Sequence, residues 1–265
     1  DNLFYSAIKV MPASFPDSMK KDLTEKYSAA IKTKLIPQYN KMATFLTKEY
    51  LPASRSTSGL GSLPFGKQLY ATYVKQWTTT QMNPEAIHEL GLQEVARINS
   101  EMEKVKMQVG FKGTLLEFFE EVRNKRELKP FTKPEQVIAN FDSIYSRIKP
   151  NVDQLFSLQP KTKFEIRRTE TFREKTASAE YNQGTADGSR AGIFYVPIPD
   201  VENYNKYGDE DLFLHEAIPG HHFQISLQQE NKSLPDFRKF NWFGAYGEGW
   251  ALYTESLGKE LGLYR

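Results

Sequence analysis

The chain has 265 residues, with 35 basic and 33 acidic side chains, a formal net charge of +2 and no cysteine. This near balance gives no electrostatic footprint for nucleic acid. The lack of cysteine excludes disulfides, thiolate metal sites and cysteine nucleophiles. No run of about 18 apolar residues is present, so the sequence predicts no membrane-spanning helix. The 18 Phe and 14 Tyr provide ample material for a core in one large or two small domains.

The first part of the chain is predicted to be helical after a short extended lead-in. Residues 3–10 are apolar and β-tolerant, and we expect a strand or an extended segment there. Apolar residues at helical spacing predict a helix over about 18–48. Residues 51–66 are rich in Pro, Ser and Gly and predict a loop, whereas residues 77–80 (WTTT) favour extended structure.

Three further helices are predicted from start signals and apolar spacing. Asn83 followed by proline begins a helix that runs to about residue 108. A second helix begins at Gly113-Thr114, and Thr132 is a candidate cap for a third over 134–148. Pro150 and Pro160 then bracket a separate short helix.

The C-terminal part mixes strands with two helices that carry the chemistry. Residues 164–169 alternate and predict a strand, 180–192 predict a loop, and 192–199 are the strongest strand candidate. Two prolines, at 197 and 199, confine that strand to a sheet edge or a strand end. Helices are expected over about 209–230 and 246–261.

The expected fold class is mainly α with a small β-sheet, an α+β fold. We expect one mostly helical domain over residues 1–265. It comprises a helical portion over 1–160 and a portion over 161–265 that holds the strands and the metal-site helices.

Three of the four histidines, His215, His221 and His222, fall in one short run with Glu216. His and Glu are the ligand and base types of a catalytic zinc, best known as His-Glu-x-x-His on one helix face. Here an unbroken helix would place His221 roughly 120° from His215, and His222 roughly 10 Å further along the axis. Neither arrangement allows two rings to reach one ion.

A break in the helix resolves this mismatch. Pro219 has no N–H for the carbonyl of His215, and Gly220 permits unusual backbone angles. We expect a bulge at these two residues that lets His221 take the place of the second ligand, with His222 as the alternative.

A third ligand is expected from the second helix. Glu248 and Glu255 are seven positions apart and share a helix face. Glycines flank Glu248, which favours it as the ligand, and Glu255 is expected to support a ligand or to replace one. Three protein ligands with an open fourth position are typical of catalytic zinc.

The chain resembles a bacterial family catalogued as domain of unknown function 885. The motifs that carry the resemblance are residues 77–80, 88–98, 181–190 (YNQGTADGSR), 193–197 (IFYVP), 215–222 (HEAIPGHH) and 247–253 (GEGWALY). The resemblance implies a zincin-like helical architecture and a zinc metallopeptidase with a glutamate ligand. It also implies an exported protein, periplasmic or lipid-anchored, of which this chain is a partial-length piece. By the same resemblance, the strand over 192–199 is expected to take substrate as an added strand.

The predicted function is zinc-dependent hydrolysis of a peptide, with Glu216 as general base. Tyr195 and Tyr181 are candidate donors to the oxyanion, and Arg190 is a candidate partner for a substrate carboxylate. Two alternatives stay open: hydrolysis of a small non-peptide amide, and a non-catalytic binding or structural domain with a vestigial metal site. His and carboxylate ligands also suit other divalent ions, and the sequence does not fix the oligomeric state.

Overall fold

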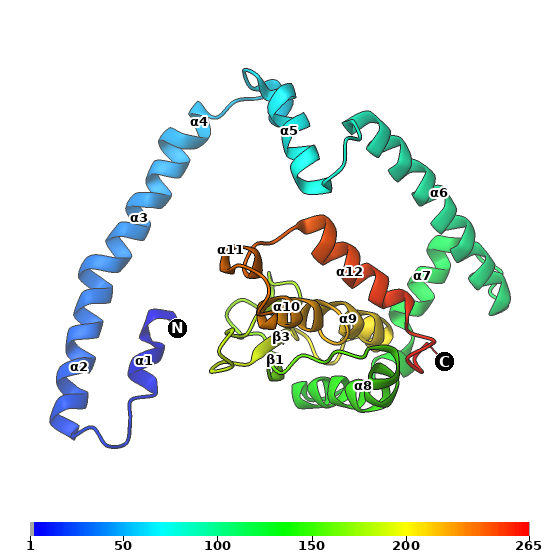
Figure 1. The fold of residues 1–265 in the computed structure, drawn as a ribbon. Helices are drawn as coiled ribbons and strands as arrows, with labels where there is room; N and C mark the ends of the chain where they lie inside the picture. Colours follow the sequence, from blue (N-terminus) through cyan, green and yellow to red (C-terminus); the bar gives the residue numbers. More distant parts are fainter. Residues whose placement is uncertain (1–2, 265) are drawn as a thin grey trace. The chain divides into compact units, whose positions relative to one another are not determined.

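The protein is mainly helical with a small three-stranded sheet, as predicted for an α+β fold (Figure 1). A computed structural model describes residues 3–264. The chain falls into two compact units, Asp1–Leu69 and Tyr70–Arg265, and each is described by itself. The single domain over residues 1–265 and its division near residue 160 stay predictions.

The first unit is built around one long helical run. It holds η1 (Leu3–Tyr5), α1 (Ser6–Lys9), α2 (Asp17–Ala30), η2 (Ile31–Leu35), α3 (Ile36–Phe45), η3 (Leu46–Tyr50), α4 (Leu51–Ala53) and η4 (Leu60–Ser62). The predicted strand or extended lead-in at residues 3–10 is wrong, because η1 and α1 make this segment helical. The ring of Phe4 packs 6.0 Å from that of Tyr39, so tertiary contact overrides the local β preference.

The middle of the chain contains four α-helices, two of which differ from their local signals. They are α5 (Gly66–Thr78), α6 (Pro84–Gln108), α7 (Leu115–Asn124) and α8 (Pro134–Leu155), with η5 (Arg126–Leu128) after α7. The caps at Asn83 and Thr114 are confirmed: Ala86 N donates to the Asn83 side chain, and Thr114 forms a capping box.

Three predictions in this region are wrong. Residues 77–78 end α5 instead of being extended, and the Trp77 ring packs so closely on α12 that a Cβ at Gly244 would lie 2.9 Å from it. Pro150 does not end a helix, because α8 continues through it. Burial of Ile148 and Val152 on the same face offsets the lost hydrogen bond. Nor is Thr132 the cap of α8, since Lys133 occupies that position.

The sheet has the strand order β1-β3-β2, with β1 (Phe164–Arg168) parallel and β2 (Glu180–Asn182) antiparallel to β3 (Gly192–Val196). The strands over 164–169 and 192–199 are thus confirmed with slightly shorter bounds. Of the two placements predicted for 192–199, the sheet edge is wrong because β3 is central, and the strand end is confirmed. Its two prolines follow the last paired residue and leave the ladder intact. β2 falls in a segment predicted to be a loop.

The core of the second unit lies where α8, the sheet and α9 (Asp209–Glu216) meet. Phe141, Phe194 and Phe213, one from each of these elements, are fully buried. The rings of Phe141 and Phe194 make an edge contact at 5.2 Å between centroids. Burial of each such side chain contributes about 1.5–3 kcal/mol. This packing fixes the position of α9, whose last two residues belong to the candidate site.

The remaining elements complete the site. They are η6 (Lys206–Gly208), α10 (His221–Glu230), α11 (Asp236–Lys239) and α12 (Gly244–Ser256). In Figure 1, α9 and α10 follow one another beside the sheet, and α12 crosses near them. No helix within residues 3–264 is both long and apolar enough to cross a bilayer.

Candidate metal centre

A sharp bend separates α9 from α10, as predicted from the Pro-Gly pair. The Ile218–Pro219 peptide bond is cis, and α10 begins directly after Gly220. A Cβ at Gly220 would lie 1.9 Å from the carbonyl oxygen of His215, so no larger residue fits. The φ of Gly220, −75°, is ordinary for any residue. Glycine is therefore needed here because a side chain would collide with the backbone of His215.

Helix α12 holds the bend in place through two hydrogen bonds. Trp250 Nε1 donates to the carbonyl of Pro219 at 2.8 Å, and the Thr254 hydroxyl donates to the carbonyl of Leu214 at 2.8 Å. The second bond is buried, where leaving a carbonyl without a partner would cost about 1–3 kcal/mol. Two hydrogen bonds thus connect α12, the helix that carries Glu248, to the bend between His215 and His221.

The structure brings His215, His221 and Glu248 together. One ligand atom from each lies within 4.8 Å of the other two. Nε2 of His215 and Nε2 of His221 are both 3.6 Å from Oε2 of Glu248. Tetrahedral zinc with bonds of about 2.0–2.1 Å needs ligand atoms about 3.4 Å apart. The spacing and the donor types therefore fit a zinc ion with little movement.

His222, the alternative ligand, points elsewhere. It is 1% exposed, and its Nδ1 forms a hydrogen bond of 2.9 Å with the hydroxyl of Tyr181. Its ring also packs against that of Phe164 at 5.0 Å. Burial lowers the pKa of His222 to about 4, so the ring is neutral near pH 7. The bend thus separates two adjacent histidines, one facing the metal centre and one linking α10 to β2.

Glu255 contacts His215 on the side away from Glu248. Nδ1 of His215 donates to Oε1 of Glu255 at 2.7 Å. A histidine held in this way presents Nε2 as a lone pair, which is the form that binds a metal. Nδ1 of His221 is buried and has no hydrogen-bond partner among residues 3–264.

Glu216 lies beside the ligand cluster at a cavity of about 670 Å³. Its side chain is buried, and burial raises its pKa to about 7. His215 and the backbone of Tyr181 act in the opposite direction, whereas the charges of Glu248 and Glu180 raise the pKa further. A carboxyl in this state exchanges protons near neutral pH.

The cavity is lined by the ligand cluster, by β2 and by an aromatic segment before α12. Trp242 contributes the aromatic wall, with its ring 5.7 Å from that of His221. A Cβ at Gly247 would lie 2.0 Å from the Trp242 ring, so this glycine lets the ring reach α12. Tyr181 of β2 was expected at the site, but Trp242 was not. The only sequence signal for Trp242 is its position in the connection before the Glu248 helix.

The three candidate substrate contacts are placed differently from one another. Tyr181 lines the cavity, although its hydroxyl is engaged by His222. Tyr195 is absent from the lining, and the guanidinium of Arg173 lies 5.3 Å from its ring centre. Arg190 is exposed in the loop between β2 and β3 and also does not line the cavity. The structure therefore brings Tyr181 to the site and leaves Tyr195 and Arg190 outside it.

Comparisons with known proteins bear on the family to which the chain belongs. A crystal structure described as that of the "putative lipoprotein from Colwellia psychrerythraea" matches with a TM-score of 0.88 and 28% sequence identity. The match covers 99% of this chain and 45% of the other, so this chain spans less than half of that protein's length. No curated protein matches significantly. The model of the family described as "Bacterial protein of unknown function (DUF885)" matches residues 1–265, and the chain therefore belongs to this family.

Proposed function

We propose that the chain carries the active site of a zinc-dependent hydrolase, and that its substrate is a peptide. The observation that carries the proposal is the convergence of Nε2 of His215 and Nε2 of His221 on a carboxylate oxygen of Glu248, which lies 3.6 Å from each nitrogen. Exposed acidic clusters are common without a metal. Here, however, two imidazoles take part, and one of them is oriented by the partly buried carboxylate of Glu255.

The donor set fits zinc and leaves room for chemistry. Two imidazoles and one carboxylate are the protein ligands of many catalytic zinc sites, which keep a fourth position open. When bound, zinc polarises a water or a carbonyl and lowers the pKa of the water toward neutrality. The cavity beside the three ligands gives a substrate access to that position.

The roles of the surrounding residues follow from their contacts. Glu216 accepts a proton from the attacking water and returns it to the leaving amine, and its side chain lines the cavity beside the ligands. Glu255 holds His215 in the tautomer that binds metal through Nε2. Trp242 shields one side of the His221 ring.

An extended peptide fits the cavity because β2 is an edge strand. Within residues 3–264, β2 pairs only with β3, and it lines the cavity next to Glu216. A peptide can add to such an edge through main-chain hydrogen bonds. β2 thus replaces the strand over 192–199 as the proposed substrate-binding edge, and this arrangement favours a peptide over a small amide. By similarity to the Colwellia protein, we further propose that the intact protein is exported and lipid-anchored.

The role of Glu216 is tested by Glu216→Gln, which keeps the size of the side chain and removes the base. We expect peptide hydrolysis to fall by about 100-fold or more while metal content is unchanged. Digestion of a peptide library, followed by mass spectrometry, measures the first quantity. The matched control is Glu165→Gln, which changes an exposed glutamate on β1 and should leave activity intact. Full activity in Glu216→Gln would exclude Glu216 as the base.

A further inference from the structure

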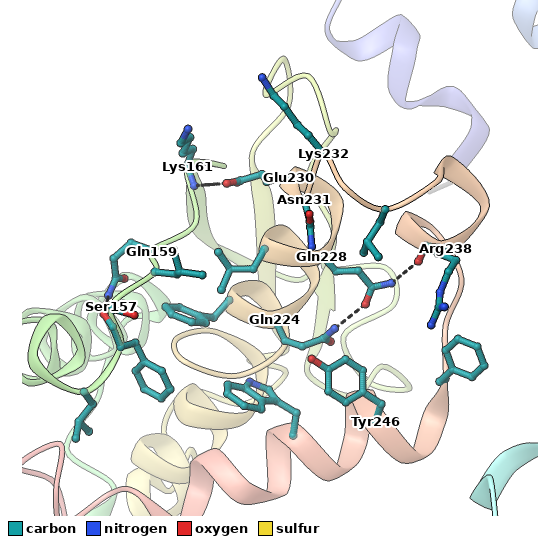
Figure 2. A pocket seen from close by; sticks show the side chains of 18 residues that line it. Ser157, Gln159, Lys161, Gln224, Gln228, Glu230, Asn231, Lys232, Arg238 and Tyr246 are labelled. Atoms are coloured by element: carbon teal, nitrogen blue, oxygen red, sulfur yellow. Dashed lines mark hydrogen bonds between the residues drawn. The ribbon is translucent and has the colours of Figure 1, made fainter.

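A second cavity of about 880 Å³ lies along α10, between α10, α12 and the segment after α8 (Figure 2). Its base is aromatic: the Phe156 ring is 5.2 Å from that of Phe223 and 6.1 Å from that of Trp250. It shares no lining residue with the cavity at the metal centre. Its volume is in the range of small-molecule sites, which are about 300–1,000 Å³.

A row of hydrogen bonds along one wall fixes the orientation of two glutamine amides. Nε2 of Gln228 donates to the carbonyl oxygens of Arg238 and Asn241, at 2.7 and 3.2 Å. Oε1 of Gln228 therefore faces Gln224 and accepts from its Nε2 at 2.9 Å. Reversing either amide would set two oxygens or two NH₂ groups against each other.

This row leaves one acceptor without a partner. Oε1 of Gln224 is buried and has no hydrogen-bond partner among the residues that the structure describes, and the whole residue is only 6% exposed. Figure 2 shows the Gln224 amide inside the cavity, near Tyr246 and in line with Gln228. Buried polar atoms are normally satisfied, so this oxygen calls for an N–H or O–H donor from a ligand.

The charge around the cavity is positive. Lys161, Lys232 and Arg238 line it, and none of them forms an ion pair with a residue in the range 3–264. The one acidic lining residue is Glu230, whose carboxylate already accepts from the backbone N–H groups of Lys161 and Thr162. The field at the cavity therefore favours an anionic ligand.

We propose that this cavity binds an N-acylated apolar amino acid, through its apolar side chain, its amide N–H and its carboxylate. The side chain packs on the aromatic base, the N–H donates to Oε1 of Gln224, and the carboxylate faces Arg238. The site is separate from the metal centre, and its occupancy does not depend on zinc or on the proposed hydrolysis.

The probe is N-acetyl-L-phenylalanine, titrated into the chain and followed by calorimetry. Two analogues each remove one feature: O-acetyl-L-3-phenyllactate has an ester oxygen in place of the amide N–H, and N-acetyl-L-phenylalaninamide lacks the charge. We expect each analogue to bind about fivefold more weakly than the probe. A factor of this size corresponds to the loss of one neutral hydrogen bond or of one partly screened charge interaction. Binding of the probe should be equal in wild type and in His215→Ala, which separates this site from the metal centre.

Two variants locate the site. Gln224→Met should weaken binding of the probe about fivefold and leave binding of O-acetyl-L-3-phenyllactate unchanged, because only the probe uses the lost acceptor. Arg238→Gln should weaken binding of the probe and leave binding of N-acetyl-L-phenylalaninamide unchanged. Lys239→Gln removes the same charge from α11 without lining the cavity, and should leave probe binding near the wild-type value. Absence of saturable binding to wild type overturns the proposal, as does equal binding by wild type and Arg238→Gln. If Gln224→Met does not fold, the Arg238 pair and the analogues still decide the outcome.

Discussion

The hydrogen bond between Glu255 and His215 offers a graded perturbation of the proposed zinc site. It joins Oε1 of Glu255 to Nδ1 of His215 at 2.7 Å, and the two side chains are only 25% and 22% exposed. Solvent screening is therefore incomplete. A hydrogen bond to a charged group contributes about 1.5–3 kcal/mol, and a neutral one about 0.5–1.5 kcal/mol.

Glu255→Gln keeps an acceptor at this position and loses only the charge. The hydrogen bond to His215 is then weaker by about 1.4 kcal/mol, the difference between a charged and a neutral bond. We expect zinc affinity to fall about tenfold in Glu255→Gln and about 100-fold in Glu255→Ala, where the ring also loses its orientation. The assay is competition for zinc with a chromophoric chelator of known affinity. The control is Glu260→Gln, which removes an exposed charge after α12.

The ordering of the variants is the decisive feature of this test. Affinity within twofold of wild type for both Glu255 variants, with both folded by circular dichroism, would refute the orienting role of Glu255. An equal loss in Glu260→Gln would assign the effect to general electrostatics instead of the hydrogen bond.

Two further predictions concern stability. Gly192→Ala would place a Cβ 2.2 Å from the Tyr181 hydroxyl oxygen and break the hydrogen bond of that hydroxyl to His222. We therefore expect the free energy of unfolding, measured in urea, to fall by about 1–3 kcal/mol. The control is Gly91→Ala on α6, where a Cβ meets nothing within 4 Å and the change should be neutral or stabilising. Burial raises the pKa of Asp209 to about 7 from an ordinary 3.8, so the folded state holds a proton that the unfolded state releases. Stability from this group is complete below about pH 4 and is lost as pH rises through 7. Unfolding free energy should therefore fall over this range, by up to about 4 kcal/mol relative to Asp209→Asn. A difference independent of pH would contradict this.

The parts of the fold that depend on nearby residues could be predicted from the sequence. Asn83 and Thr114 begin helices because their side chains cap backbone groups only three residues away. The break between α9 and α10 follows from Pro219 and Gly220, and it makes His221 the histidine that faces Glu248. Each of these features is decided within a few turns of the chain.

Features that depend on partners distant in sequence could not be predicted. β2 is three polar residues long, and it becomes a strand only because β3 pairs with it. The central position of β3 depends on β1, which joins it from the other side. Because side chains alternate along a strand, this pairing decides that Tyr181 reaches the cavity while Tyr195 packs under Arg173. The same limit applies to Trp242, which arrives at His221 through a close fit with Gly247.

The central claim is that three side chains hold one metal ion, and elemental analysis of purified chain tests it most directly. We predict about one zinc per chain in wild type after zinc loading, and none in His215→Ala. His88→Ala, which removes an exposed histidine on α6, should keep the zinc of wild type. Zinc absent from loaded wild type, or equal in wild type and His215→Ala, would contradict the metal centre.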